Sequence, residues 1–126
     1  MASARQPVMR IATKRIYEAA AAEDGARVLV DGLWPRGVSK RAAALDGWYR
    51  ELAPSRDLRR WFAHDRARWP GFVKAYHAQL EHADAQLIEQ LRAQAADAGL
   101  TLLFAARDTE CNNAVALKAY LEGRDD

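Results

Sequence analysis

A chain of 126 residues is expected to form one domain, and with half of its residues hydrophobic and 29% charged it has the composition of a soluble globular protein. The single cysteine, Cys111, excludes an intrachain disulfide and fits a reducing cytoplasm. No apolar run resembles a secretory signal or is long enough to span a membrane, so we expect a cytoplasmic protein with no membrane partner.

Charge is unevenly distributed along the chain, although the formal net charge is only +2. Residues 36–68 hold nine basic and four acidic side chains, whereas residues 81–126 hold nine acidic and four basic ones. Such asymmetry can indicate a basic surface for anions or nucleic acid. Alternatively, the two segments neutralise each other across the folded surface.

The first part of the chain predicts two strands. Residues 9–17 combine β-branched and aromatic residues with partial alternation, which is typical of a strand. Residues 27–31, RVLVD, form an apolar run of the kind found in the middle of a sheet that is covered on both faces. Asp24 and Gly25 indicate a turn between them. No element is assigned to residues 39–55.

Helical signals dominate from Ser55 onward. Ser55 is a typical N-cap for a short helix, and Pro70 marks the start of a longer one. Apolar residues then recur at three- and four-residue spacing, namely Phe72, Val73, Tyr76, Leu80, Leu87, Ile88 and Leu91. Asp84 is expected to cap a second helix that ends before Gly99.

The last part of the chain completes an α/β pattern. Residues 100–106 predict a second buried strand, and residues 108–123 a final helix. Two apolar strands separated by helices favour a right-handed parallel crossover. We therefore predict a single small α/β domain over residues 1–126, with a mainly parallel sheet flanked by helices. The sheet would be mixed if residues 9–17 paired antiparallel with 27–31. Residues 1–8 and 123–126 are expected to fray.

The predicted site lies where the two apolar strands end. The carboxyl ends of parallel strands share one edge of the sheet, where ligands bind in open α/β folds. The residues expected to converge there are Asp31, Trp34, Arg36, Arg107, Asp108, Cys111, Asn112 and Asn113. Pro35 would stiffen the turn that holds Arg36, as bidentate binding of a carboxylate or phosphate requires. The amino end of the final helix would face the same space.

The candidate catalytic residues are Asp31, His64 and Asp108. Asp31 could act as a base or as the partner of Arg36, and His64 as an acid or base near neutral pH. Cys111 is expected in the first turn of the final helix, where the helix dipole would lower the pKa of its thiol. As a nucleophile, Cys111 would need His64 as its base.

The candidate ligand-binding residues are Trp34, Arg36, Arg107, Asn112 and Asn113. Structural alternatives stand beside the functional ones: Asp31 can cap a turn, Trp34 can close the edge of the core, and the asparagines can complete the start of the helix. No pair of histidines or cysteines at i, i+4 and no phosphate-binding glycine loop is present in the sequence, so neither a metal nor a cofactor is expected.

Four stretches of the sequence together resemble a known family. They are RVLVDGLWPRGVSK, ELAPSRDLRRWFAHD, RWPGFVKAYHAQL and TLLFAARDTECNNAVALKAYL, and they extend over about residues 9–122. They are similar to the YeaO-like branch of the bacterial domain-of-unknown-function family 488. The resemblance implies a small cytoplasmic α/β domain and supplies no activity.

The chain departs from the family pattern at three places. Gly32 stands where the resemblance implies an arginine, which removes one positive group from the predicted site. Cys111 stands where a histidine is common. The wider family has a Cys-His-Arg run at the start of the last helix, whereas this chain has Asn112, Asn113 and Ala114.

Two functions of different classes follow. The favoured one is an enzyme or small-molecule binder that takes an anionic ligand at the carboxyl edge of the sheet. The alternative is a non-enzymatic module whose basic segment 36–68, with Trp48, Trp61 and Trp69 interleaved, contacts nucleic acid or a protein. No nucleic-acid-binding motif is recognisable in the sequence.

Overall fold

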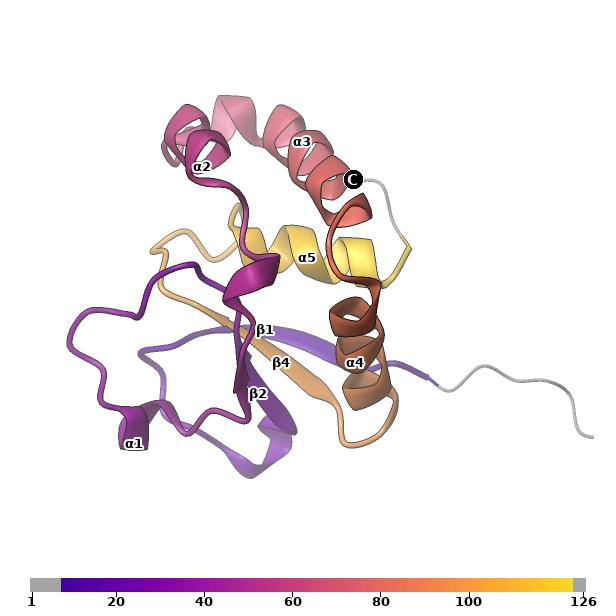
Figure 1. Ribbon diagram of the computed structural model, residues 1–126. Helices are drawn as coiled ribbons and strands as arrows, with labels where there is room; N and C mark the ends of the chain where they lie inside the picture. The colour runs from indigo at the N-terminus through magenta and orange to yellow at the C-terminus, as the bar shows by residue number, and fades with distance from the viewer. Residues whose placement is uncertain (1–7, 124–126) are drawn as a thin grey trace, which may run out of the picture.

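The computed structural model describes residues 8–123. The expectation of fraying therefore lies outside the described residues at 1–7 and 124–126. Within the described range the chain forms a single α/β domain around a four-stranded parallel sheet, in the order β1-β4-β2-β3 (Figure 1). The strands are β1 (Ile11–Arg15), β2 (Ala26–Leu29), β3 (Gly47–Trp48) and β4 (Leu100–Phe104).

The position of β1 decides between the two alternatives for the sheet, which is parallel throughout and not mixed. β1 does not pair antiparallel with β2; it lies parallel to β4, with Ile11 opposite Leu100 and Arg15 opposite Phe104. β4 lies between β1 and β2 because all five of its residues are buried, so it needs a neighbour on each side. β1 carries Lys14 and Arg15, which an edge strand accommodates near solvent.

The helices begin and end largely where the sequence predicts them. Helix α2 (Arg56–Phe62) is capped by the Ser55 hydroxyl, and helix α3 (Trp69–Glu81) has Pro70 in its first turn. Helix α4 (Ala85–Ala96) is capped by the Asp84 carboxylate. Gly99 follows α4 with a φ of 92°, the left-handed conformation that ends helices at glycine.

Helix α5 (Asn113–Leu121) starts later than predicted. The Asn112 side chain accepts a hydrogen bond from the Val115 amide and is the N-cap, so residues 108–111 lie outside the helix. Cys111 is therefore not in the first helical turn. The segment left unassigned contains a short helix, α1 (Lys40–Ala43), then β3, and then a 3₁₀ turn, η2 (Arg50–Leu52). Two further 3₁₀ turns are η1 (Ala22–Asp24) and η3 (Arg66–Arg68).

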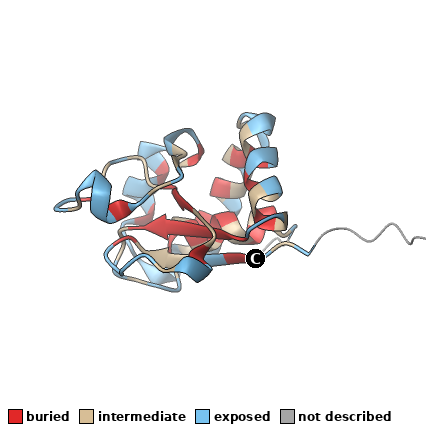
Figure 2. Ribbon diagram, turned by 90° about the horizontal axis from the view of Figure 1, so that it is seen from below, coloured by how far each residue is buried: buried red, intermediate tan, exposed pale blue. Residues whose placement is uncertain are grey.

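Alternation along the strands divides the core between the two faces of the sheet. Val28, Leu102 and Phe104 belong to the larger cluster with helices α2 to α5. Leu29 and Leu103, on the opposite face, belong to a smaller cluster. The central strands β2 and β4 are buried between these two layers (Figure 2), as the apolar runs predict. None of the helices in the described part of the chain is long and apolar enough to cross a membrane.

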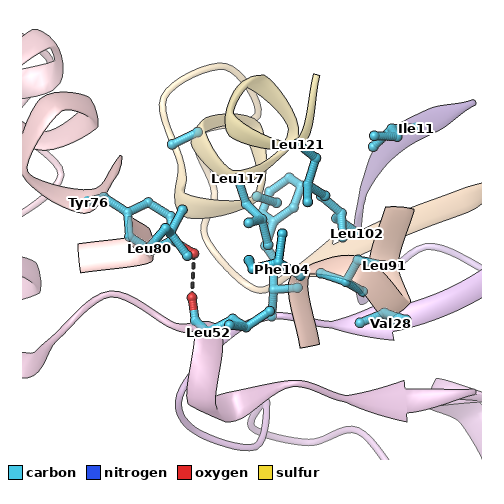
Figure 3. Packing of buried hydrophobic residues seen from close by; sticks show 14 of the residues in the cluster. Ile11, Val28, Leu52, Tyr76, Leu80, Leu91, Leu102, Phe104, Leu117 and Leu121 are labelled. Carbon is cyan, nitrogen blue, oxygen red and sulfur yellow. Dashed lines mark hydrogen bonds between the residues drawn. The ribbon is translucent and has the colours of Figure 1, made fainter. Parts of the chain in front are cut away.

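A buried hydrogen bond joins helix α3 to the segment below it. The Tyr76 hydroxyl donates to the Leu52 carbonyl oxygen at 2.5 Å, in the middle of the larger cluster (Figure 3). Tyr76 is fully buried, and its burial raises the pKa of the phenol far above its ordinary value. Helix α3 is therefore positioned by a polar contact as well as by its apolar stripe.

Candidate functional site

A cleft of about 410 Å³ lies at the carboxyl edge of the sheet. It is bordered by the segments that follow β1, β2 and β4, by helix α2 and by the start of α5, which share one side of the molecule in Figure 1. Of the residues expected to converge, those that line the cleft are Asp31, Trp34, Arg36, Cys111, Asn112 and Asn113. His64, a candidate catalytic residue outside that set, lines it as well. Arg107 and Asp108 do not line it.

Asp31 joins three elements beneath the cleft. Its Oδ2 accepts a hydrogen bond from the Ala105 amide at 2.9 Å, directly after β4, and its Oδ1 accepts one from Asn113 Nδ2 at 3.0 Å. Burial raises the pKa of this carboxyl, and the hydrogen bonds from Asn113 and Ala105 and the charge of Arg59 oppose the rise. Both carboxylate oxygens thus accept hydrogen bonds from the protein, so the main role of Asp31 is to hold these three elements together.

The two asparagines at the start of α5 differ in what they can offer a ligand. Asn112 is buried, caps the helix and donates to the Asp108 carbonyl oxygen at 2.9 Å, so its amide is fully engaged. Asn113 is half-buried and donates from Nδ2 to Asp31 and to the Val30 carbonyl oxygen. Its Oδ1 accepts no hydrogen bond from a described residue, which leaves an acceptor at the cleft.

The turn after β2 is held in place by contacts of Trp34. Trp34 Nε1 donates to the Val38 carbonyl oxygen at 2.7 Å, and the Trp34 ring packs edge-on against Trp48 at 5.5 Å. Trp34 therefore completes the smaller core cluster while it borders the cleft. Arg36 is exposed, and its guanidinium makes no ion pair or hydrogen bond with a described residue.

A second arginine, Arg59, lines the same cleft from helix α2 and was missed in the sequence. Its Nη1 atom lies 3.6 Å from where a Cβ on Gly32 would be. A guanidinium from another element thus occupies the space beside Gly32, where one positive group fewer was expected. Like Arg36, it makes no ion pair or hydrogen bond with the described residues. The N-cap signal at Ser55 predicted where helix α2 begins, but it did not indicate which face of the helix turns toward the sheet.

Tyr17 was also missed as a cleft residue. It lies two residues beyond the end of β1 and is 48% exposed. Because β1 runs parallel to β2 and β4, Tyr17 comes to the same edge of the sheet as Asp31. An antiparallel pairing of β1 would have placed it at the opposite edge.

Asp108 is directed away from the cleft. It forms a bidentate pair with Arg66 at 2.8 Å and accepts hydrogen bonds from the amides of Glu110 and Cys111. The pairing with Arg66 and these amide bonds lower the pKa of Asp108 to about 2. Asp108 thus orders the loop that precedes α5. Arg107, beside it, is exposed and outside the cleft.

The pKa of the Cys111 thiol shifts in the direction opposite to the expected one. Burial, followed by the negative charge of Asp108, raises the pKa of Cys111 rather than lowering it. The physical reason is that Cys111 precedes the helix and sits beside a carboxylate, so the favourable dipole of a first-turn position is absent.

His64 lies at the cleft, and no carboxylate of residues 8–123 forms a hydrogen bond or ion pair with it. Ala63 and His64 both have left-handed backbones, with φ of 46° and 57°, which turn the chain sharply at the end of α2. The neighbouring Asp65 carboxylate accepts from the Ala67 amide and caps η3. His77 is half-buried and hydrogen-bonds the Ala116 carbonyl oxygen at 2.8 Å. No group of three metal-ligating side chains occurs within residues 8–123.

The fold and cleft define a small parallel α/β domain with a ligand-sized site at the carboxyl edge of its sheet. A family model described as "Inactive DUF488-N3 subclade" matches residues 10–125, and the chain belongs to this DUF488 family. The resemblance to the YeaO-like branch is confirmed: the Escherichia coli (strain K12) protein named "Uncharacterized protein YeaO" is 40% identical over 113 residues, covering 90% of this chain and 97% of the relative.

Mycobacterial relatives are more distant. "Uncharacterized protein Rv3073c" of Mycobacterium tuberculosis (strain ATCC 25618 / H37Rv) and "Uncharacterized protein Mb3100c" of Mycobacterium bovis are each 33% identical over 115 residues. These matches cover 91% of this chain and 96% of each relative. No solved structure gives a significant match.

Proposed function

We propose that this protein binds a small anionic ligand in the cleft at the carboxyl edge of the sheet and does not itself catalyse a reaction. The observation that carries the proposal is the pair of guanidinium groups, Arg36 and Arg59, that line one cleft without ion-pair partners among the described residues. Arginine in such a place is suited to a carboxylate or phosphate.

The balance of charge in the cleft supports an anion. Among the described residues that line it, Asp31 is the only acid, and both of its oxygens already accept hydrogen bonds. The remaining lining is largely aromatic and aliphatic, which lowers the local dielectric and strengthens the attraction between arginine and an anion.

Binding without catalysis is supported by the state of each candidate catalytic group. Asp31 is engaged in hydrogen bonds from Ala105 and Asn113, Asp108 is paired with Arg66, and the thiol of Cys111 has a raised pKa. Among the described residues no acid orients His64, since the neighbouring Asp65 caps a turn. Acyl-transfer and hydrolytic sites usually contain a nucleophile, a base within hydrogen-bonding reach of it and a third group that orients the base. The description of the matching subclade as inactive points the same way.

The alternative, a nucleic-acid or protein surface on segment 36–68, has less support. Trp48 packs against Trp34 and donates from Nε1 to the Asp31 carbonyl oxygen, and Trp69 stacks with Phe72. Trp61 is 46% exposed, whereas Trp48 and Trp69 are half-buried. The three tryptophans therefore do not form one exposed stacking surface.

A thermal-melt screen tests the proposal. Inorganic phosphate, citrate, nucleotides and short oligonucleotides are added to wild type, Arg59→Gln, Arg36→Gln and the control Arg60→Gln, which lies on the same helix but does not line the cleft. A ligand at a hundred times its Kd should add about 2.7 kcal/mol to the stability of wild type. We expect the gain to persist in Arg60→Gln and to fall in both cleft variants.

The salt dependence of binding distinguishes a nucleic-acid surface on segment 36–68 from an anion site in the cleft. Binding through many phosphates weakens by orders of magnitude between low and physiological salt, whereas one or two partly desolvated ion pairs weaken far less. Stabilisation only by oligonucleotides, equal in all four proteins and lost with salt, would reject the cleft as the working site.

A further inference from the structure

Tyr17 is an exposed aromatic ring that is fixed at the rim of the cleft. The Arg15 guanidinium lies over the ring at 5.0 Å and is itself held by hydrogen bonds to the carbonyl oxygens of Ala105 and Ala106, at 3.1 and 2.9 Å. The Tyr17 hydroxyl donates to the Arg36 carbonyl oxygen at 3.2 Å. The ring is thus tethered at both ends, yet 48% of the residue is exposed.

Exposed apolar side chains concentrate at this rim. The large hydrophobic residues that the described chain exposes are Val8, Tyr17, Leu33 and Trp61. Two of them, Tyr17 and Leu33, line the cleft, and Leu33 is 69% exposed. A preorganised ring beside an exposed leucine favours a flat apolar surface on the ligand, because no side-chain entropy is lost when such a surface stacks.

The polar groups of the cleft select among planar anions. An amino acid or another zwitterion would need a carboxylate for its ammonium group, and the Asp31 oxygens are occupied by Ala105 and Asn113. Two unpaired guanidinium groups suit a phosphate, which accepts several hydrogen bonds. The Asn113 Oδ1 atom adds an acceptor for an N–H or O–H group of the ligand.

We infer that the ligand is a nucleotide unit, with its base stacked on Tyr17 and its phosphate directed to Arg36 and Arg59; this inference rests on the proposed function. The cleft volume of about 410 Å³ lies at the lower end of the range of small-molecule sites and suits one nucleotide. The unit could be a free mononucleotide or the end of a single strand, and these two sources share the same base and phosphate chemistry.

Calorimetric titrations separate the base from the phosphate. Adenosine 5′-monophosphate, ribose 5-phosphate and a 5′-phosphorylated single-stranded decanucleotide are titrated into wild type, Tyr17→Ala, Tyr17→Phe, Arg59→Gln and Arg60→Gln. We expect the monophosphate to bind wild type about tenfold or more tightly than ribose 5-phosphate, because stacking adds to the phosphate contact.

Each variant has its own expected result. Tyr17→Ala should bind the monophosphate no better than ribose 5-phosphate, while Tyr17→Phe, which keeps the ring, should retain most of the preference. Arg59→Gln should weaken both compounds about tenfold, and Arg60→Gln neither. Tighter binding of the decanucleotide than of the monophosphate identifies a strand end as the source, and the reverse identifies the free nucleotide.

Failure of this inference and failure of the proposed function give different results. If ribose 5-phosphate or citrate binds in an Arg59-dependent manner and the base adds nothing, the cleft binds anions and the nucleotide inference is wrong. Equal weakening of both phosphates by Tyr17→Ala would also overturn it. If no anion binds wild type, the proposed function itself is overturned.

Discussion

Asp31 is a carboxylate held at the junction of β2, β4 and α5, where its ionised form loses much of its hydration. Burial raises its pKa despite the hydrogen bonds from Asn113 and Ala105 and the charge of Arg59. A carboxyl whose pKa is higher in the folded than in the unfolded state stabilises the fold at low pH. That contribution is lost as the pH rises through the folded-state pKa.

The raised pKa of Asp31 predicts how the effect of Asp31→Asn on stability depends on pH. The difference in unfolding free energy, wild type minus Asp31→Asn, should decrease as the pH rises from about 4, near the ordinary carboxyl pKa, toward 8. Urea unfolding of both proteins across this range measures it. Contributions from Asp24 and Asp108, whose pKa values are lowered, are common to both proteins and cancel. A difference that grows with pH would contradict the assignment.

Two glycines of the turn after β2 should respond oppositely to alanine. Gly32 does not have a left-handed backbone, and a Cβ there would lie 3.6 Å from Ala53 Cβ and Arg59 Nη1, in ordinary contact. Gly32→Ala should therefore stabilise by about 0.4–1 kcal/mol, through lower entropy of the unfolded chain. Gly37 has a φ of 79°, so Gly37→Ala should destabilise by about 1–2 kcal/mol although the space around it is open. Thermal melts rank the two variants, and the opposite order would refute the argument.

At the scale of elements, two adjacent residues of helix α3 attach it to its surroundings through polar contacts. Tyr76 bonds the Leu52 carbonyl in η2, and His77 bonds the Ala116 carbonyl in α5. Adjacent residues of one helix thus contact two different elements. These contacts fix how far α3 lies from the sheet, and hence where Phe72 of α3 borders the cleft.

Tyr76→Phe tests the first of these contacts. It leaves a buried carbonyl without its partner, and we expect a loss of about 1–3 kcal/mol in unfolding free energy. Tyr49→Phe is the matched control, because the Tyr49 hydroxyl donates to Gln90 Oε1 in an exposed hydrogen bond, and its loss should change stability by less than about 0.5 kcal/mol. Equal effects in urea unfolding would show that burial does not decide the cost.

At the scale of the whole molecule, a buried charge network lies away from the cleft. Asp24 pairs with Arg27 at 2.6 Å and Lys14 at 3.1 Å, and its carbonyl oxygen accepts from the Thr101 hydroxyl. Although burial of Asp24 acts to raise its pKa, these pairs and the Ala21 amide lower it below its ordinary value. The network joins β1, β2 and β4.

Asp24→Asn should destabilise the whole domain. It leaves the buried Arg27 guanidinium without its charge partner, and breaking such a pair costs about 3–5 kcal/mol. Glu23→Gln, an exposed neighbour, should cost less than about 0.5 kcal/mol. Because the network does not line the cleft, folded Asp24→Asn protein should bind ligand with unchanged affinity. Reduced affinity in fully folded protein would show that the two regions are coupled.

Local signals in the sequence predicted much of the fold and part of the cleft. The apolar runs identified β2 and β4, and Ser55, Asp84 and Gly99 marked helix ends, because each signal depends on residues within one or two turns of the chain. Parallel strands then predicted that residues 31–36 and 107–113 meet at one edge, and of these the residues at 31–36 and 111–113 line the cleft.

Only the tertiary structure decided which other side chains join these residues at the cleft. β1 lies beside β4 and brings Tyr17 to the cleft, α2 turns Arg59 toward Gly32, and Arg66 draws Asp108 away. Strand order, helix rotation and ion pairing between distant residues result from packing across the whole domain. No window of the sequence contains both partners of such a contact, so the local pattern determined the elements and the edge, whereas long-range packing determined the composition of the site.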